Sequence, residues 1–326
     1  MFAPSLSRFF LFFYSLIFLS TLLQTSASPV SGAPIAVRDA RNGIKITKPF
    51  TTESTDAGQN IVSIQSAGSP SLTGPPRDKK IINHGGRVLT NTVNVYYIYY
   101  GSWQKNDQKI LEYLMSNIGS TNYYKIVTSY YDRLRNPVSG GLNLAGTYTD
   151  NYSVGKNITD DTMVEVVANA IQTANWPLDQ TAVYYILGSA DVNHTSGFCE
   201  DFCGFHTFDT IRGKPIKYAF VGTPTSCLEG CAPLQAGGKS PNNSPAIDGM
   251  ASVIMHELVE SVTDGEYNAW YDDADYEAAD KCVWNYGGSA FIRNATNGGL
   301  FNVVVGSKKF LLQQLWHTQK NCSLSV

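Results

Sequence analysis

The sequence contains few charged residues. Of its 326 residues only 16% are Asp, Glu, Lys or Arg, with 24 basic against 27 acidic side chains and a formal net charge of -3. Proteins that bind nucleic acid or an anionic membrane through charge carry basic patches, and no run of Lys or Arg occurs here. Nucleic acid is therefore not the expected partner. The 19 Tyr, 15 Phe and 5 Trp residues predict instead a folded protein with a large apolar core.

Long apolar runs are also missing, apart from one near the start of the chain. Residues 9–23 (FFLFFYSLIFLSTLL) follow Arg8 and precede the small residues 25–28. The run is shorter than the roughly 20 apolar residues that a membrane-spanning helix needs. It has the pattern of a secretory signal peptide cleaved after Ala27, and a signal anchor is the alternative interpretation. We therefore predict a signal peptide over residues 1–27 and a soluble, secreted protein with no membrane association after cleavage.

Cysteine is absent from the first 198 residues, and the last part of the chain holds six. An even number of cysteines in a secreted protein permits complete pairing. Two Cys-x-x-x-Cys units and one distant pair suggest two local bridges and one distant bridge. A zinc site with four thiolates is the alternative, but thiols oxidise outside the cell. The predicted disulfides are Cys199 with Cys203, Cys227 with Cys231, and Cys282 with Cys322.

Five Asn-x-Ser/Thr sequons fit the same secretory route, because this motif accepts N-linked glycans on exposed surfaces of secreted proteins. The predicted glycosylation sites are Asn151, Asn157, Asn193, Asn294 and Asn321.

The character of the chain changes near residue 87. Residues 28–86 are rich in Ser, Thr, Gly and Pro, and predict a flexible leader or propeptide. Residues 87–326 form the predicted globular domain. Apolar runs predict buried strands at 93–100, 182–187 and 216–221, and helical spacing predicts helices at 107–118 and 159–174. The expected fold class is α/β, with α+β as the alternative: a single domain in which helices pack on a mixed sheet.

The segment from Ser244 to Asp264 predicts a helix with possible metal ligands on one face. Ser244 and Pro245 are typical of a helix start, with the Ser side chain as the cap. His256 and Glu260 lie four residues apart, one turn above each other. The string resembles the zincin motif H-E-x-x-H, in which two imidazoles hold zinc and the Glu activates water, with a carboxylate in place of the second imidazole. Zinc accepts carboxylate oxygen, so the exchange keeps a possible site.

Further acidic residues follow this helix. Glu277 and Asp280 resemble the second motif by which gluzincin metalloproteases supply a third ligand and a supporting carboxylate. Nine of the 27 acidic residues lie between His256 and Lys281. If they converge, they must either raise their pKa values or bind a cation. The expected cofactor is zinc; calcium is the alternative, because the acidic run 272–277 would suit an oxygen-binding ion, and a solvated acidic loop without metal is the third interpretation.

Other catalytic patterns are missing. No Gly-x-Ser-x-Gly nucleophile motif occurs, and paired cysteines leave no thiol nucleophile. His206 is interpreted as a structural histidine, with a place in the lining of a cleft as the alternative, and His194, inside a sequon, as exposed.

The middle of the chain resembles the exordium family, also called phosphate-induced protein one. The residues that carry the resemblance are the strings YYILGSAD (184–191), SGFCEDFCGFH (196–206), YAFVG (218–222), CLEGCA (227–232) and DGM (248–250). The resemblance implies a secreted extracellular or cell-wall protein, associated in plants with growth, and implies no established reaction. Plant members do not carry His-Glu-x-x-Glu on the corresponding helix, so the motif is a feature of this sequence and its closer, microbial or fungal-type relatives.

Two functions are therefore expected. The first is a zincin-like metal-dependent hydrolase of peptide or amide bonds, with His256, Glu260 and Glu277 as ligands, Asp280 in support and Glu257 as general base. The second is a non-catalytic extracellular or cell-wall binding or signalling protein, in which a cation, if bound, only stabilises the acidic loop. The expected partner is an extracellular peptide or a cell-wall component.

Overall fold

The computed structural model describes residues 45–47 and 80–326 of the chain. The predicted signal peptide and most of the predicted leader lie outside these residues. Within the described part, the helices are too short or too polar to cross a membrane.

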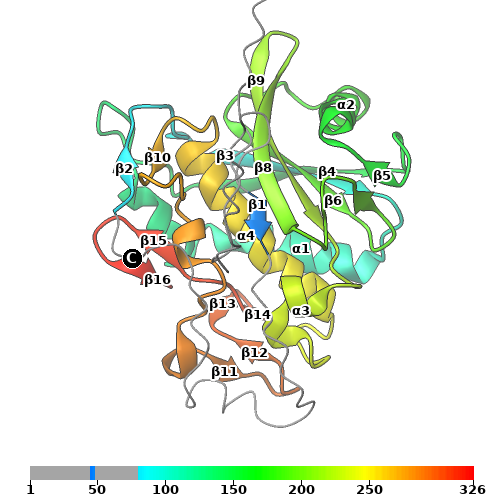
Figure 1. Cartoon of the computed structure of the whole chain (residues 1–326), viewed down its shortest axis with the longest axis vertical. Helices are drawn as coiled ribbons and strands as arrows, with labels where there is room; N and C mark the ends of the chain where they lie inside the picture. Colours follow the sequence, from blue (N-terminus) through cyan, green and yellow to red (C-terminus); the bar gives the residue numbers. More distant parts are fainter. Residues whose placement is uncertain (1–44, 48–79) are drawn as a thin grey trace, which may run out of the picture. The chain divides into compact units, whose positions relative to one another are not determined.

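A mixed sheet of six strands forms the centre of the domain, in the order β1–β8–β9–β6–β3–β4 (Figure 1). Four neighbouring strands, β9, β6, β3 and β4, run parallel. β8 pairs antiparallel with β9, and β1 pairs antiparallel with the other edge of β8. The bounds are β1 Lys45–Thr47, β3 Val93–Tyr100, β4 Leu142–Asp150, β6 Ala182–Gly188, β8 Phe202–Ile211 and β9 Lys214–Gly222.

Helices cover both faces of this sheet. Alternate residues of a strand point to opposite faces. Tyr97 and Tyr99 of β3 pack in the core that contains α1 (Lys105–Ile118) and α4 (Pro245–Asp264), whereas Ile98 and Tyr100 pack in a second core with α2 (Asp160–Thr173). A parallel strand buried on both faces has a continuous apolar sequence, which explains the run at 93–100. The fold is therefore mixed α+β, and it has the multi-stranded sheet and packed helices that were predicted.

Short elements complete the domain. β2 lies before the predicted domain start at residue 87 and pairs with β10. The other small sheets are β5–β7, β11–β12, β13–β14 and β15–β16. The bounds are β2 Ile82–Asn83, η2 Tyr124–Ser129, β5 Asn157–Ile158, β7 Asn193–His194, α3 Leu228–Cys231, η3 Pro233–Gln235, β10 Trp270–Tyr271, η4 Asp280–Cys282, η5 Gly288–Ala290, β11 Arg293–Asn294, β12 Leu300–Phe301, β13 Val303–Val305, β14 Lys308–Phe310, β15 Leu315–His317 and β16 Asn321–Ser323.

The predicted helices are present, with one difference at a cap. The Thr159 side chain accepts the backbone N–H of Thr162 and caps α2. α4 begins after Ser244 with Pro245 in its first turn, as predicted, but the Ser244 side chain makes no capping bond. Its hydroxyl donates to Asp107 of α1 at 3.0 Å instead. The side chain therefore joins two helices rather than satisfying the end of one.

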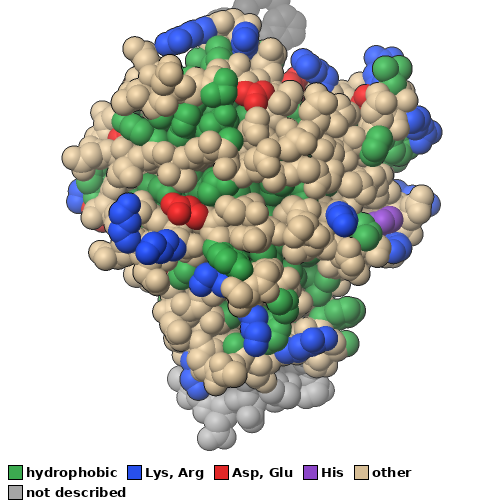
Figure 2. All heavy atoms as spheres, turned by 180° about the vertical axis from the view of Figure 1, so that it is seen from behind, with side chains coloured by type: hydrophobic (Ala, Val, Ile, Leu, Met, Phe, Trp, Pro, Cys, Tyr) green, Lys and Arg blue, Asp and Glu red, His purple; other side chains and the backbone are tan. Residues whose placement is uncertain are grey.

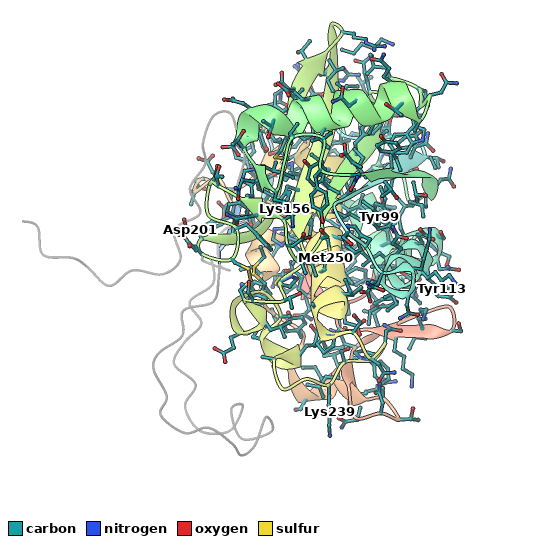
Figure 3. All side chains as sticks on the ribbon, turned by 90° about the vertical axis from the view of Figure 1, so that its right-hand side faces the viewer. Tyr99, Tyr113, Lys156, Asp201, Lys239 and Met250 are labelled. Atoms are coloured by element: carbon teal, nitrogen blue, oxygen red, sulfur yellow. A yellow bond between two sulfur atoms is a disulfide. The ribbon has the colours of Figure 1, made fainter. Side chains whose placement is uncertain are left out.

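α4 is buried along almost its whole length, including its polar residues. Every residue from Ile247 to Asp264 is buried. Figure 3 shows this helix, marked by Met250, enclosed by the other elements, with Tyr113 of α1 beside the β13–β14 hairpin, where its hydroxyl contacts Ser307. Close packing of α4 on β8 depends on Gly204, because a Cβ at this position would lie 2.7 Å from Val253 of α4. The absence of a side chain at residue 204 thus brings the helix and the strand together.

The disulfides differ from the prediction. Cys199 pairs with Cys227 and Cys203 with Cys231, so the predicted bridges within each Cys-x-x-x-Cys unit are wrong. The predicted bridge between Cys282 and Cys322 is confirmed. The two local units lie on different elements, the start of β8 and α3, and each cysteine of one unit faces a cysteine of the other. Sequence spacing gave no information about this alignment.

The two neighbouring bridges give a testable difference in stability. Both span 28 residues, so the loop-closure entropy that they remove from the unfolded chain is the same. Cys203 and Cys231 are each 1% exposed, whereas Cys199 and Cys227 are partly exposed. We expect Cys203→Ala/Cys231→Ala to lower the free energy of unfolding by about 1–2 kcal/mol more than Cys199→Ala/Cys227→Ala, because it also leaves a cavity. Urea unfolding measures the difference.

The same variants check the pairing. Neither double variant should contain a free thiol in a thiol titration under denaturing conditions. Two free thiols in each variant would show that the bridges follow the local units, and equal unfolding free energies would contradict the cavity argument.

Candidate metal centre

α4 presents His256 and Glu260 on one face, as their spacing predicts. His256 Nε2 lies 3.1 Å from Glu260 Oε1, and both side chains are 0% exposed. The helix therefore places a nitrogen and an oxygen donor side by side in the protein interior.

The loop after α4 brings a third donor. Asp280 Oδ1 lies 3.3 Å from His256 Nε2, and the backbone N–H of Asp280 donates to Glu260 Oε1 at 3.0 Å. Glu277 contacts Asp280 through its backbone, because its N–H donates to Asp280 Oδ2 at 3.2 Å. The carboxylate that reaches His256 is thus Asp280, and Glu277 points elsewhere. One ligand atom each from His256, Glu260 and Asp280 lie within 4.8 Å of one another.

His206 of β8 joins the same cluster from the sheet. Its Nε2 lies 3.3 Å from Glu277 Oε2 and 3.6 Å from Glu260 Oε2. His206, Glu257 and Glu260 form a second group of donors within 4.8 Å, so Glu260 belongs to both groups. Sequence reasoning interpreted His206 as structural and missed this placement. The sequence contains one signal for this placement. Gly204 lies two residues before His206 on the same face of the strand, and a glycine there allows a helix to approach that face closely.

The contacts around His256 Nε2 do not have the geometry of hydrogen bonds. Glu260 and Asp280 lie at short distances, but neither oxygen makes a well-directed bond with this nitrogen. Four donors around a zinc ion at about 2.0–2.2 Å would lie about 3.3–3.6 Å apart. The observed separations of 3.1 and 3.3 Å are close to that value. These two separations are compatible with binding of one ion by the three side chains.

Gln313 orients His256, and no motif in the sequence indicates this role. Its Nε2 donates to the carbonyl of Ala279 at 3.0 Å, and its backbone N–H donates to Ser252. The remaining amide oxygen lies 3.2 Å from His256 Nδ1 and accepts its proton. Nε2 then faces two carboxylates, an arrangement that favours a proton or a cation between them. Metal-binding histidines commonly donate their second N–H in this way.

The electrostatics of the cluster favour a positive charge. Burial acts to lower the pKa of His256, but Glu260 and Asp280 outweigh it and hold that pKa well above its ordinary value. Burial raises the pKa of Glu260 to about 7; Asp280 adds to the rise, and His256 opposes it. Without a cation the cluster therefore retains protons, which a bound metal ion would replace.

Glu257 lies beside these ligands and has an unusual environment. It is 0% exposed, and neither carboxylate oxygen makes a hydrogen bond of ordinary geometry with the described residues. Burial raises its pKa well above the ordinary value; the charge of His256 and the nearby backbone N–H of His206 oppose the rise. A buried carboxyl group with so few well-directed hydrogen bonds is costly and is typical of a functional position.

The other acidic residues are bonded within the protein. Asp264 accepts the backbone N–H groups of Asn268 and Ala269 at the end of α4. Asp272 binds Lys281 through Oδ2, and its Oδ1 accepts backbone N–H groups of its own loop. Both oxygens of Asp272 are therefore engaged. On the face shown in Figure 2, Asp and Glu side chains are few and scattered, so no acidic patch lies there.

The predicted exposure of His194 and of the five glycosylation sites can be compared with the structure. His194 is 0% exposed, so its predicted exposure is wrong. Its ring packs among Phe202, Phe205 and Phe220, whereas the neighbouring Asn193 is exposed. All five predicted glycosylation sites are exposed, as glycan attachment requires: Asn151, Asn157, Asn193, Asn294 and Asn321.

A buried ion pair holds the loop that carries Glu277 and Asp280. Lys281 Nζ lies 2.6 Å from Asp272 Oδ2, and both side chains are 0% exposed. The disulfide from Cys282 to Cys322 lies next to this pair. The loop is thus fixed by a charge interaction and a covalent bond, which position Asp280 beside α4.

This ion pair gives a second testable prediction. Lys281→Met keeps much of the side-chain volume but leaves Asp272 buried and unpaired, so we expect a loss of about 3–5 kcal/mol in the free energy of unfolding. Urea unfolding measures the change. The control is Lys156→Met, which removes the exposed ion pair with Asp191 and should leave stability almost unchanged. Similar small losses in both variants would contradict an anchoring role for Lys281.

Comparison with known proteins gives the family. Residues 81–325 match the family model described as the phosphate-induced protein 1 conserved region. The chain is 33% identical over 274 residues to EXORDIUM-like 3 of Arabidopsis thaliana, covering 74% of this chain and 81% of that protein. It is 25% identical over 293 residues to PHOSPHATE-INDUCED 1 of Nicotiana tabacum, covering 78% and 91%. The chain therefore belongs to the phosphate-induced protein 1, or exordium, family, and the predicted resemblance is confirmed.

A comparison with solved structures finds no match for this chain. The family is known here through sequence alone, and its name identifies no reaction.

Proposed function

We propose that this protein is a secreted metal-dependent hydrolase that cleaves peptide or related amide bonds. The observation that carries the proposal is the proximity of His256, Glu260 and Asp280 in the interior, with Glu257 beside them, whose oxygens make no hydrogen bond of ordinary geometry with the described residues. Three protein ligands leave a position for a water molecule or substrate, as in catalytic zinc sites. In this proposal Asp280 takes the ligand role that the motif suggested for Glu277, and Glu277 supports His206.

Zinc suits these ligands better than calcium. Imidazole nitrogen favours zinc and other transition metals, whereas calcium prefers oxygen ligands only. The acidic run that would suit calcium contributes Asp272, whose two oxygens are already bonded. When bound, the metal ion would polarise the scissile carbonyl and lower the pKa of water.

Glu257 is the proposed general base. It follows His256 directly, so the helix presents it beside the ligands. Its raised pKa makes the carboxylate a stronger base, which can take a proton from water and pass it to the leaving nitrogen. No other carboxyl group in the cluster combines complete burial with two oxygens that lack hydrogen bonds among the described residues.

Several features support export from the cell. The apolar run at residues 9–23 has the length of a signal peptide, the three disulfides fit an oxidising compartment, and the five sequons are exposed. The proposed substrate is therefore an extracellular peptide or a peptide-bearing component of the cell wall.

One observation favours the alternative, a non-catalytic extracellular protein. The proposed ligands and Glu257 are 0–5% exposed, so a closed site could hold a cation only to stabilise the loop that contains Asp280. A structural ion site of this kind would not need an accessible base.

Metal analysis and peptide cleavage separate these functions. We expect about one zinc ion per chain in the purified protein by elemental analysis, and loss of zinc in His256→Ala and Glu260→Gln. Glu257→Gln should retain zinc but lose about 10²-fold or more in the rate of cleavage of a broad peptide mixture. The control Glu165→Gln changes an exposed carboxylate on α2 and should alter neither property.

The results that contradict the hydrolase are equally distinct. Bound calcium without turnover, or zinc without turnover in the wild type, would favour the non-catalytic protein. Equal cleavage by wild type and Glu257→Gln would exclude Glu257 as the base.

A further inference from the structure

The strand that carries His206 also forms a binding edge beside the candidate metal centre. β8 pairs with β9 from Gly204 to Ile211. Its opposite edge pairs with β1, whose three residues come from a distant part of the chain. Figure 1 shows β1 beside β8, and β8 packs against α4, which carries His256 and Glu260.

The pairing between β1 and β8 is irregular at the point where it approaches the cluster. Lys45 faces Phe205 and Thr47 faces Phe202, so three residues of β1 span four residues of β8. Such a bulge inserts an extra residue in one strand and changes the direction of the side chains that follow. The extra residue in β8 comes just before His206, and both Gly204 and His206 then face α4.

A polypeptide in extended conformation is the ligand that such an edge recognises. The backbone groups of an edge strand bind another strand through regular hydrogen bonds, independently of most side chains. β1 is itself an example, since a segment of only three residues is aligned by this edge. The opposite edge of the sheet is β4, whose side chains alternate between partly buried and exposed, and no candidate metal-ligand group includes a residue of that strand.

We propose that the edge of β8 binds extended polypeptide substrates antiparallel to the strand, and that Lys45–Thr47 of the same chain occupies this edge as an internal competitor. This inference rests on the proposed function, and it specifies the substrate as an extended peptide rather than a compact amide.

The register gives the direction of the bound substrate. β1 passes from Phe205 to Phe202 as it runs from Lys45 to Thr47. A substrate in the same register reaches His206 and the ligands with the residues on the amino side of its paired segment. The bond that is cleaved then lies toward the amino end of the residues that pair with Phe202–Phe205.

The test uses the full-length chain with the variant Ile46→Pro/Thr47→Pro. Proline has no N–H group, and adjacent residues of a strand direct their N–H groups to opposite sides, so one of the two substitutions removes a bond toward β8. The matched control is Ile46→Ala/Thr47→Ala, which keeps both N–H groups. Hydrogen exchange of the segment 202–205, measured by mass spectrometry, should become faster by on the order of tenfold in the proline variant and change little in the control.

A synthetic peptide of residues 42–48 then tests the edge directly. It should restore slow exchange at 202–205 in the proline variant, whereas the same peptide with proline at positions 46 and 47 should not. The same restoration is expected when Glu257→Gln is added, because binding does not need the base. Peptide cleavage should be faster in the proline variant than in the wild type.

Each outcome identifies which proposal fails. Unchanged exchange in the proline variant, or no effect of the peptide, would overturn the edge proposal whatever the activity. Peptide binding at the edge without any cleavage would keep the edge as a polypeptide-binding site and overturn the hydrolase.

Discussion

The mutual repulsion of buried carboxylates is the constraint on which the rest of this structure depends. Glu257, Glu260, Glu277 and Asp280 lie in the interior with only the imidazoles of His206 and His256 among them. Ionised carboxylates at such distances cannot remain together in a low dielectric without protons or a cation. The surrounding elements are arranged to hold this group despite its cost: Gln313 fixes one ring, and the pair Lys281–Asp272 fixes the loop.

Much of the fold could be predicted because it depends on local patterns. The strand at 93–100 and the helix capped by Thr159 follow from apolar periodicity and end signals that the structure retains. The disulfide pairing could not be predicted, because it depends on how the start of β8 lies against α3. The Ser244 side chain was assigned to a cap for a local reason, and its contact with Asp107 is a tertiary one.

The sequence was sufficient to predict the residues of the candidate site that lie on α4, but not those that other segments contribute. The four-residue spacing of His256 and Glu260 requires their proximity once α4 forms. The choice between Glu277 and Asp280 depends on the path of an irregular loop, which no periodicity describes. His206 and Gln313 reach the cluster from segments 50 and 57 residues away from His256 along the chain, so only the tertiary structure could identify them.

The two parallel bridges between the start of β8 and α3 have a consequence for the register of the sheet. A strand that slides by one residue exchanges its two faces, which here would turn the ring of His206 away from α4 and bring an aromatic side chain into its place. The bridges at Cys199 and Cys203 tie the beginning of β8 to a separate segment at two points. Oxidation therefore adds a covalent constraint on the alignment of the histidine to the ladder that β8 forms with β9.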